Sequence, residues 1–483
     1  MPYVRMRIGL VLGLVIAACS GSDRGDNVGA GGTSGGTPAN GGSTALGGSN
    51  SAGGSDSAGT SGAAEVQGGA ATGGTAANEA GAAGALHADA GAAGAGPITD
   101  PSAELYAPER LPRFDIELPA ESVAALDALT SWADPKTDEY VPATLRYGDE
   151  VIENVGLRIK GESSFRKLDK KSAFKIKFDA FVPKQSFRGL RRLTLNNMSE
   201  DPSFMAERLA YELFRAANLP APRANNALVY VNGEFYGVYA NIEAEDKTFL
   251  ARWFESNDGN LYEEGGKDFV PGAETAFDLE TNETLNDRSG LVALIAGVQS
   301  ADATNFSQSV GEKLRLSHFL RFTAAEAAVN QWDMYAYTMF FPNNFRIYED
   351  PVDGRFVFLP WGMDMAMKPF RDSGRPHIPV FGIARQGDRD NGKITAGLVF
   401  RKCLENAECK SAYAQAVAEM ADIYEQADLS QRAGAYYAQI REHVYLDPRK
   451  EYTNAAFESA YQSVLTTIEE RPEKLRADLL AAP

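Results

Sequence analysis

Two of the four aspartates in the stretch Asn330–Met367, together with a pair of asparagines, are candidates for chemistry, and the stretch is also dense in aromatic residues. Asp333 comes first, Asn343 and Asn344 follow, and Asp364 comes last. Carboxylate and amide oxygens are hard ligands of the kind that Mg²⁺ prefers when it carries a nucleotide phosphate. The alternative is that the aspartates only cap turns around a buried aromatic hairpin, because short aspartate motifs are weak signals.

A β-hairpin is predicted between the two aspartates. Residues 345–348 (FRIY) and 355–359 (RFVFL) alternate as strands do, and Asp353-Gly354 supplies the turn. Because a hairpin returns the chain to its starting point, the carboxylate before it and the carboxylate after it can end up side by side. This arrangement would suit a cation that grips a triphosphate.

Basic side chains alternate with apolar ones on two neighbouring predicted strands, which the turn Gly161-Glu162-Ser163-Ser164 connects. In so acidic a protein these polar faces form either a phosphate-facing surface or two solvated sheet faces. The turn, which includes Ser163, offers backbone N–H groups to an anion. The basic residues are Arg158, Lys160, Lys175 and Lys177.

A helix is predicted to begin with Asp201 as its N-cap and Pro202 in its first turn, and to run to about Ala217. Glu207 lies off the apolar stripe of this helix, so it is either exposed to solvent or directed into a cleft. The stripe itself consists of Met205, Leu209 and Leu213.

The remaining patterns place strands first and helices later. A second hairpin turns at Asn232-Gly233 and leads into a connector from Glu243 to Lys247; after Phe249 the chain is mainly helical apart from the hairpin at 345–359. This order predicts an α+β protein. The other predicted strands are 114–118, 141–149, 151–161, 172–181 and 191–198, and a short helix is predicted at 120–130.

The N-terminus has the features of an export signal. Arg5 and Arg7 precede an apolar run from Ile8 to Ala18, which is too short for a permanent membrane span. The run ends in Ile16-Ala17-Ala18-Cys19, which resembles a bacterial lipobox and implies cleavage before Cys19 and a lipid on its thiol. We expect a membrane-anchored lipoprotein at the outer membrane or cell surface; the alternative is an ordinary secretory signal.

Residues 20–104 are rich in Gly, Ala, Ser and Thr, and no aromatic residue occurs between Tyr3 and Tyr106. Such a segment cannot bury enough apolar surface to offset its chain entropy, so we expect a disordered tether. The expected organisation is a signal peptide at 1–19, the linker at 20–104, a β-rich lobe at 105–246 and a mainly helical lobe at 247–483.

Three cysteines are present in the whole chain. If Cys19 carries a lipid, Cys403 and Cys409 have only each other as partners in an exported protein, and we predict a small structural disulfide between them. Two free buried thiols are the alternative. A catalytic cysteine is not expected, because no nearby histidine offers itself as a base.

Composition excludes several classes of function. The formal charge is −18 and the N-terminal third has few residues that could form a basic stripe, so nucleic acid is not an expected partner. Four histidines and three cysteines are too few for a His or Cys metal cage. Neither G-x-S-x-G nor H-E-x-x-H occurs in the expected folded part, residues 105–483, which argues against a hydrolase.

Several blocks together resemble the CotH kinase family of spore-coat and cell-surface proteins. The blocks are residues 155–179, 190–243, 259–263 and 330–367, and the likeness spans about 111–369. The resemblance implies a two-lobed, atypical protein-kinase-like fold with a β-rich N-lobe and a mainly helical C-lobe. It also implies binding of ATP with Mg²⁺ or Mn²⁺ and phosphorylation of proteins on Ser or Thr.

The resemblance also implies roles for individual residues. Asp333 corresponds to the catalytic-loop aspartate, which orients the substrate hydroxyl and accepts its proton. Asn344, or Asn343 beside it, corresponds to the metal-binding asparagine, and Asp364 to the second metal-binding carboxylate. The phosphate lysine is Lys160, Lys175 or Lys177, its helix partner is Glu207, and Glu243 to Asp246 form the hinge that meets the adenine.

Two features depart from the family pattern. Many members have Pro-Trp-Asp-x-Asp where this chain has Pro360-Trp361-Gly362-Met363-Asp364, and no HRD or DFG triplet is present. The first carboxylate of the family pair is therefore missing. The alternative to a kinase is a catalytically silent, lipid-anchored binding or matrix protein on the same fold, whose acidic surface engages a basic partner or a polysaccharide.

Overall fold

The computed structural model describes residues 100–338, 341–369, 377–381 and 397–481. The expected signal peptide, Cys19 and most of the expected linker lie outside these residues. The described chain begins five residues before the expected end of the linker, and Asp100 already pairs with Arg223 at 2.7 Å. No helix in the described part combines the length and the apolar character that a bilayer crossing requires.

The first half of the described chain forms a closed β-barrel in the strand order β1-β2-β3-β4-β5-β7-β6. Neighbouring strands are antiparallel, except that β1 runs parallel to β6 and closes the barrel. The apolar residues of each strand fill the interior, as the alternation in the sequence predicts. The strands are β1 Arg113–Glu117, β2 Val141–Tyr147, β3 Glu150–Lys160, β4 Ala173–Lys177, β5 Arg192–Asn196, β6 Ala224–Val231 and β7 Glu234–Ile242.

The turn at Asn232-Gly233 joins β6 to β7 as predicted, with both residues at positive φ. The helix before it, α2 (Ala206–Ala216), begins later than the sequence suggested. Asp201 does not serve as its N-cap, because Phe204 has a φ of +60° and the chain turns once more before the helix begins. The Asp201 carboxylate still accepts the N–H of Ala206 at 2.8 Å, so it caps the helix from a distance.

The predicted aromatic hairpin is β10 (Phe345–Asp350) and β11 (Arg355–Pro360), and Gly354 has a φ of +65° in its turn. The expectation that this hairpin stands alone among helices is wrong. It belongs to a four-stranded sheet in the order β11-β10-β8-β9, with β8 at Asn260–Glu263 and β9 at Asp278–Leu279. Strands β8 and β9 are too short to leave a clear periodic pattern in the sequence.

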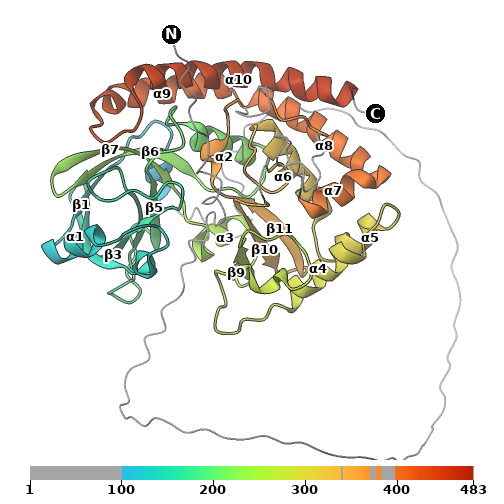
Figure 1. Cartoon of the computed structure of the whole chain (residues 1–483), viewed down its shortest axis with the longest axis horizontal. Helices are drawn as coiled ribbons and strands as arrows, with labels where there is room; N and C mark the ends of the chain where they lie inside the picture. Colours follow the sequence, from blue (N-terminus) through green and yellow to red (C-terminus); the bar gives the residue numbers. More distant parts are fainter. Residues whose placement is uncertain (1–99, 339–340, 370–376, 382–396, 482–483) are drawn as a thin grey trace, which may run out of the picture. The chain divides into compact units, whose positions relative to one another are not determined.

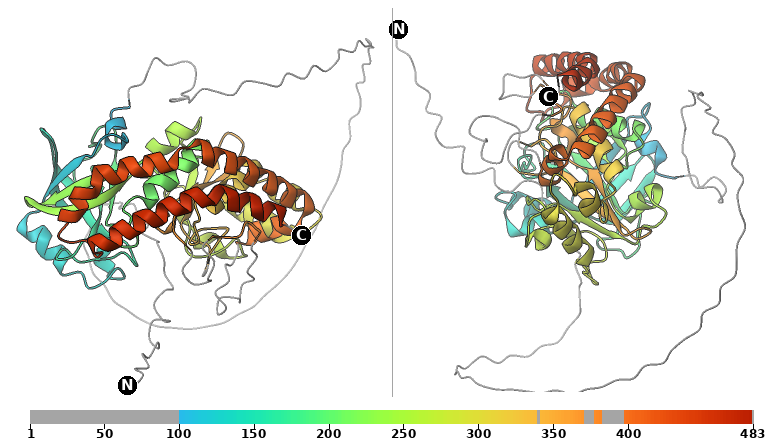
Figure 2. Two further views of the ribbon diagram at one scale, coloured as in Figure 1. Left: turned by 90° about the horizontal axis from the view of Figure 1, so that it is seen from above. Right: turned by 90° about the vertical axis from the view of Figure 1, so that its right-hand side faces the viewer.

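Helices surround this sheet and extend over the barrel. In Figure 1 α9 and α10, coloured red, lie across the top of the molecule, and Figure 2 shows them from above. Helix α9 packs on β7 and α2, whereas α10 packs on α8 and α9, so the pair contacts both parts of the fold. The helices not yet given are α1 Ala120–Asp127, α3 Lys247–Trp253, α4 Ser289–Ser300, α5 Phe306–Gly311, α6 Leu316–Ala328, α7 Leu398–Glu405, α8 Ala407–Gln426, α9 Leu429–Leu446 and α10 Asn454–Leu480; the short 3₁₀ turns are η1 Ala103–Tyr106, η2 Pro135–Asp138, η3 Ala273–Thr275 and η4 Met363–Met365.

The predicted disulfide between Cys403 and Cys409 is present. It joins the end of α7 to the first turn of α8, and both cysteines are buried. The mixed α and β content and the long C-terminal helices agree with the predicted α+β class.

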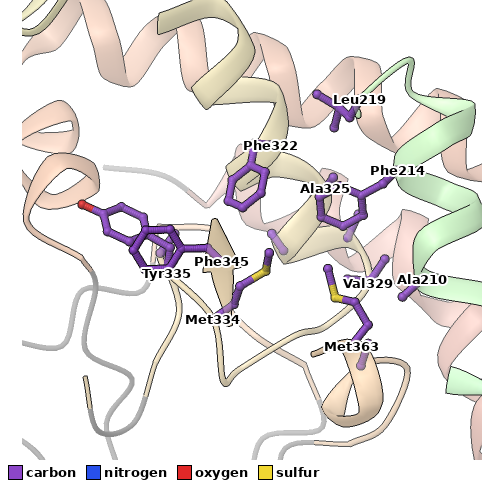
Figure 3. Close-up of a cluster of buried hydrophobic side chains, with 14 of the residues drawn as sticks. Ala210, Phe214, Leu219, Phe322, Ala325, Val329, Met334, Tyr335, Phe345 and Met363 are labelled. Carbon is purple, nitrogen blue, oxygen red and sulfur yellow. The ribbon is translucent and has the colours of Figure 1, made fainter. Parts of the chain in front are cut away.

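A buried apolar cluster fixes the chain on both sides of the candidate site. Figure 3 shows this cluster, whose labelled residues come from α2, α6, β10, η4 and the segments that follow α2 and α6. Met334 directly follows Asp333 and Met363 directly precedes Asp364, and both methionines are fully buried. Burial of these neighbours holds the backbone of each aspartate in place without burying the carboxylates completely.

Candidate active site

Asp333 lies in the segment after α6, and both predicted asparagines bind it. The side-chain nitrogen of Asn344 donates to the Asp333 carboxylate at 2.9 Å and to the Asp333 carbonyl at 2.7 Å. The side-chain nitrogen of Asn343 lies 3.4 Å from both carboxylate oxygens. These bonds also orient the amides, because the nitrogen of each amide faces the acceptor.

Two buried glutamates hold the loop around Asp333. Glu326 on α6 accepts the N–H groups of Ala336 and Tyr337 at 3.0 and 2.8 Å. Glu264, which follows β8, accepts the N–H of Asn344 at 3.1 Å. Burial raises the pKa of both glutamates well above the ordinary range. The loop is therefore positioned by hydrogen bonds from two directions.

Asp364 lies in the first turn of η4. It follows the hairpin in the chain, whereas Asp333 precedes it. The two carboxylates interact, because the charge of Asp364 helps to raise the pKa of Asp333. The main cause is burial, and the pKa of Asp333 reaches about 7. The pKa of Asp364 is raised as well, first by burial, while Lys368 and Lys160 oppose the rise. Asn344, which donates to Asp333, also lies against Gly362, two residues before Asp364, so both aspartates belong to one site.

Lys160 and Glu207 reach the same site from the barrel and from α2. The Lys160 ammonium donates to the Asn196 side-chain oxygen at 2.5 Å, and the Asn196 nitrogen donates to both Glu207 oxygens at 3.0 and 2.9 Å. Burial, followed by the charge of Asp364, raises the pKa of Glu207 to about 8. Asn196 therefore links the predicted lysine to its predicted helix partner.

Gly362 has a φ of +58°, in the left-handed region that favours glycine. A Cβ atom at this position would lie 2.3 Å from the Asn344 side-chain oxygen. The Asn344 amide therefore occupies the space that any larger residue at position 362 would need. Position 362 is where the family pattern has the missing carboxylate. In this chain the side-chain oxygen of Asn344 lies beside that position.

The oxygens of the site fit a divalent cation. The side-chain oxygens of Asn343 and Asn344 are buried and accept no hydrogen bond from the described residues. A buried acceptor left without a partner costs roughly 1–3 kcal/mol, which a bound cation would offset. Among residues 100–481 that the structure describes, no three His, Cys, Asp or Glu side chains converge as metal ligands, so amide oxygens would have to complete the set.

A narrow cavity lies between the barrel and the sheet that contains the hairpin. Its walls include Lys175 on β4, Glu245 in the connector, Arg346 on β10 and Trp361 after β11. The free volume is about 10 Å³, which is room for about one water molecule. A larger occupant would have to displace side chains of the walls, which also include Tyr140, Ile176, Arg192, Thr194 and Ala244.

Four of the predicted residues lie away from the carboxylates. Arg158 is buried against Asp138 at 3.1 Å, and Arg158 and Lys177 both approach the ring of Tyr140. Glu243 is buried, but it pairs with two arginines of its own surroundings, Arg223 and Arg252. Ser163 is exposed in its turn. Of the three candidate lysines, Lys160 is the one that acts on the Asp364 carboxylate, and Lys175 lines the cavity.

Sequence reasoning missed several members of the site. Asn196 is one residue in a strand, and Arg346 and Trp361 belong to the predicted hairpin stretch but were given no role in the site. Their only sequence signal is a polar residue inside an otherwise apolar stretch, as with Arg346 in FRIY. The remaining charged neighbours are Glu200, Asp201 and Lys368, which affect the pKa of Asp333, Glu207 or Asp364.

The chain belongs to the family described as CotH kinase protein, whose model matches residues 157–475. That range contains every site residue discussed above except Tyr140 and Asp138.

Inner spore coat protein H of Bacillus subtilis is 24% identical over 354 residues, which cover 71% of this chain and 91% of that protein. The inner spore coat protein H-like protein of the same organism is 42% identical over 59 residues, which are 12% of this chain and 19% of that protein. The crystal structure of the proinflammatory kinase CtkA of Helicobacter pylori shares 9% identity and a TM-score of 0.30, over 68% of this chain and 97% of that chain. A score this low does not define a shared fold.

Proposed function

We propose that this protein is a metal-dependent kinase that transfers the γ-phosphate of ATP to Ser or Thr hydroxyls of surface or coat proteins. The observation that carries the proposal is the Asp333 carboxylate, which two asparagine amides orient beside a second aspartate. Membership of the CotH kinase protein family supports the same reaction class.

Asp333 is the base of the proposed reaction. A hydroxyl oxygen of the substrate forms the new bond to phosphorus, the bond between phosphorus and the bridging oxygen breaks, ADP leaves, and the hydroxyl proton passes to Asp333. A pKa near 7 suits this role, because a general base works best when its pKa is close to the operating pH. The Asn343 and Asn344 amides keep the carboxylate aimed while it accepts the proton.

Lys160, Asn344 and Asp364 bind the nucleotide in this proposal. A divalent cation, when bound, neutralises charge on the phosphates, and the Asn344 oxygen and the Asp364 carboxylate are the residues that would hold it. Lys160 lies between Asn196 and Trp361 and would pair with phosphate oxygens. Asn196 and Glu207 position the lysine, much as a helix glutamate does in protein kinases.

One observation favours the catalytically silent alternative. Gly362 supplies no carboxylate, so the site has one anionic ligand fewer than the family pattern. The Asn344 oxygen beside Gly362 supports the kinase, because it offers a neutral ligand close to the same place. A neutral ligand holds a cation more weakly than a carboxylate, so we expect a modest metal affinity and not its loss.

We further propose that the kinase is exported and held at the outer membrane or cell surface by a lipid on Cys19. The lipobox-like sequence supports the anchor, and the Cys403–Cys409 disulfide supports an oxidising compartment. The charge of −18 favours a substrate or surface partner with basic segments and argues against nucleic acid.

Nucleotide binding is the first test. Thermal unfolding of the full-length protein is followed with ATP and Mg²⁺ or Mn²⁺, in the native form and in Asp364→Asn. A nucleotide at 100 times its dissociation constant stabilises by about 2.7 kcal/mol, and the variant should lose most of that metal-dependent shift. Asp422→Asn is the matched control, because Asp422 pairs with Arg476 at 2.7 Å on exposed helix surfaces and should leave the shift unchanged.

Transfer of labelled phosphate from ATP separates the two candidates. The kinase predicts labelling of the protein itself or of a basic Ser/Thr peptide, in the native form and in Asp422→Asn. Binding of ATP without any transfer would support the silent protein. No stabilisation by any nucleotide and metal would overturn the proposal.

A further inference from the structure

A second cavity, with a volume of about 340 Å³, opens at the far end of β10 from the candidate active site. Asn344 directly precedes β10 and Asp350 is its last residue, so the six residues of the strand, about 20 Å of extended chain, separate the two places. None of the described residues that line this cavity belongs to the candidate active site. Its volume is typical of small-molecule sites, which occupy about 300–1,000 Å³.

The cavity lies beside β11, an edge strand whose outward backbone groups are already bonded. The Arg315 N–H donates to the Phe356 carbonyl at 3.1 Å, and the Phe356 N–H donates to the Lys313 carbonyl at 2.7 Å. The Nε2 atom of His318 lies 2.8 Å from the Phe358 carbonyl. A peptide therefore cannot bind here by adding a further strand to the sheet, and a ligand must be held by side chains.

The side chains of the wall offer both donors and acceptors. Because a carbonyl only accepts, the His318 proton is on Nε2, which leaves Nδ1 as an acceptor. Burial lowers the pKa of His318 to about 4, so the ring stays neutral. Arg315 donates through Nη2 to Asp350 at 2.6 Å and through Nε to Asp353 at 2.9 Å, which leaves Nη1 as a donor. Glu255, which is exposed, adds a carboxylate acceptor.

The charges of the wall disfavour an ionic ligand. Arg315 already pairs with two carboxylates, so it has little charge left for an anion, and the Glu255 carboxylate would repel one. A cation would meet the Arg315 guanidinium, because Asp350 is held behind it. The neutral His318 ring adds no charge. A neutral ligand with several hydrogen-bonding groups fits this wall.

Aromatic and aliphatic side chains form the rest of the wall. Trp253, the last residue of α3, lines the cavity and is half-buried, and the ring of Phe254 packs on Tyr348 with their centres 4.6 Å apart. Val352 in the hairpin turn is 57% exposed. The faces of a sugar ring carry C–H groups that pack on an aromatic ring, and each of its hydroxyls both donates and accepts.

We propose that this cavity binds a neutral saccharide, with the Trp253 ring against one face of a pyranose. Arg315 donates to the sugar hydroxyls, and His318 and Glu255 accept from them. The site is separate from the proposed kinase site and does not depend on its activity. A glycan bound here would hold the protein on a polysaccharide surface and leave the cleft with Asp333 open to other molecules.

The test is a ligand-observed NMR titration of the full-length protein with maltotriose, cellotriose and triacetylchitotriose. These neutral oligosaccharides differ in linkage and in their N-acetyl groups, so together they sample the proposed class of ligand. At least one of them should bind saturably with a dissociation constant of about 1 mM or tighter, measured up to about 10 mM. Adding ATP with Mn²⁺ should not displace it.

Variants locate the binding in the cavity. Trp253→Ala should weaken it by about 5- to 30-fold, and Glu255→Ala by about 2- to 10-fold. Val352→Lys, which places a longer side chain beside the cavity, should also weaken it. Trp132→Ala is the matched control, because Trp132 is a 36% exposed tryptophan in the loop after α1, and it should leave the affinity unchanged. The unfolding temperature of each variant without ligand shows that it has folded.

The proposal is wrong if none of the oligosaccharides binds the native protein, if Trp253→Ala and Glu255→Ala bind as tightly as the native protein, or if ATP with Mn²⁺ displaces the sugar. Binding of a basic Ser/Thr peptide that depends on Trp253, without any binding of sugar, would make the cavity a peptide site and overturn the proposal as well. Should Trp253→Ala fail to fold, Glu255→Ala and Val352→Lys decide, because both change exposed side chains. Asp333→Asn should bind the sugar normally, so a failure of the kinase proposal leaves this one standing.

Discussion

Two clusters, each with a lysine and an acid, link the barrel to the rest of the molecule. One consists of Lys171, just before β4, and Asp447, just after α9; the other is the cleft that contains Lys160, Asp364 and Asp333. Both join segments that are distant in sequence; Lys171 and Asp447 are buried, whereas Lys160, Asp333 and Asp364 are each partly exposed. They differ in how completely their polar atoms are satisfied.

The Lys171–Asp447 junction is complete. Lys171 lies 2.5 Å from the Asp447 carboxylate, and Asp447 also accepts the N–H groups of Val238 and Arg449 at 3.1 and 2.9 Å. Gly237 has a φ of +135°, and a Cβ there would lie 2.3 Å from the same carboxylate, so the backbone approaches closely. Every part of this cluster is explained by holding α9 against the barrel.

The cleft is incomplete by the same measure. The side-chain oxygens of Asn343 and Asn344 lack hydrogen-bond partners within the described chain, and three carboxylates have raised pKa values because burial and mutual repulsion disfavour their charges. A folded protein tolerates such a cluster where a ligand repays its cost. The comparison therefore assigns the junction to stability and the cleft to binding and chemistry.

The largest expected effect is on catalysis and belongs to the cleft. Asp333→Asn removes the base but keeps the shape of the side chain, and it should lower the rate of phosphate transfer by about 10²- to 10⁴-fold. Labelled ATP and a basic Ser/Thr peptide measure that rate. The unfolding temperature without nucleotide should stay level or rise, because the buried charge is gone. A rate within tenfold of the native value would remove Asp333 from the mechanism.

The next effect belongs to the junction and falls on stability. Asp447→Ala leaves the Lys171 ammonium buried without a partner and should cost about 3–5 kcal/mol in the free energy of unfolding. Glu451→Ala, which breaks the more exposed pair with Arg166, should cost about 1 kcal/mol or less. Adding Lys171→Met to Asp447→Ala should recover part of the loss. Urea unfolding measures all three variants, and equal costs for Asp447→Ala and Glu451→Ala would break the distinction.

The sequence predicts those parts of the cleft that depend on local structure. The turns at Asn232-Gly233 and Asp353-Gly354 need positive φ, which Asn and Gly adopt more readily than other residues. The second turn brings Asp364 back towards Asp333. The disulfide follows from a count of cysteines. The approach of Lys160 and Glu207 could be expected only from the family resemblance, because strand alternation alone treats Lys160 and Arg158 alike.

The parts that the sequence does not predict depend on contacts between distant segments. Arg158 has the same strand phase as Lys160, yet Asp138 of η2 covers it, and no local pattern reveals that pair. Helix α2 begins at Ala206, later than predicted, because Phe204 adopts a positive φ that its residue type does not suggest. Glu245 and Arg346 become neighbours only when β10 packs beside the connector.

A smaller effect is expected from Gly362→Ala, which tests the amide ligand. The new Cβ would displace the Asn344 oxygen, and alanine at a φ of +58° costs about 1–2 kcal/mol. We expect a lower unfolding temperature and a several-fold weaker metal dependence of ATP binding. Gly354→Ala is the matched control, since Gly354 has a φ of +65° in the hairpin turn and its Cβ would approach only the end of Lys313. If both variants bind the metal equally well, the Asn344 oxygen is not a ligand.

The smallest expected effect is a difference in how stability responds to pH. Burial raises the pKa of Asp333 and Glu207 from ordinary values of 3.8 and 4.5 to about 7 and 8. Between these limits the folded protein binds more protons than the unfolded chain, so its stability should fall as the pH rises from about 4 to 8. Glu207→Gln removes one of these groups and should raise the unfolding temperature at pH 8, by about 1 °C for each kcal/mol relieved in a folded chain of this size. The gain in unfolding temperature should vanish below pH 4. Saturating ATP with Mn²⁺ should reduce the gain, because the bound cation would offset the repulsion between the carboxylates. A variant that is no more stable at pH 8 than at pH 4, relative to the native protein, would mean that the cleft carries no such cost and would remove the contrast with the Lys171–Asp447 junction.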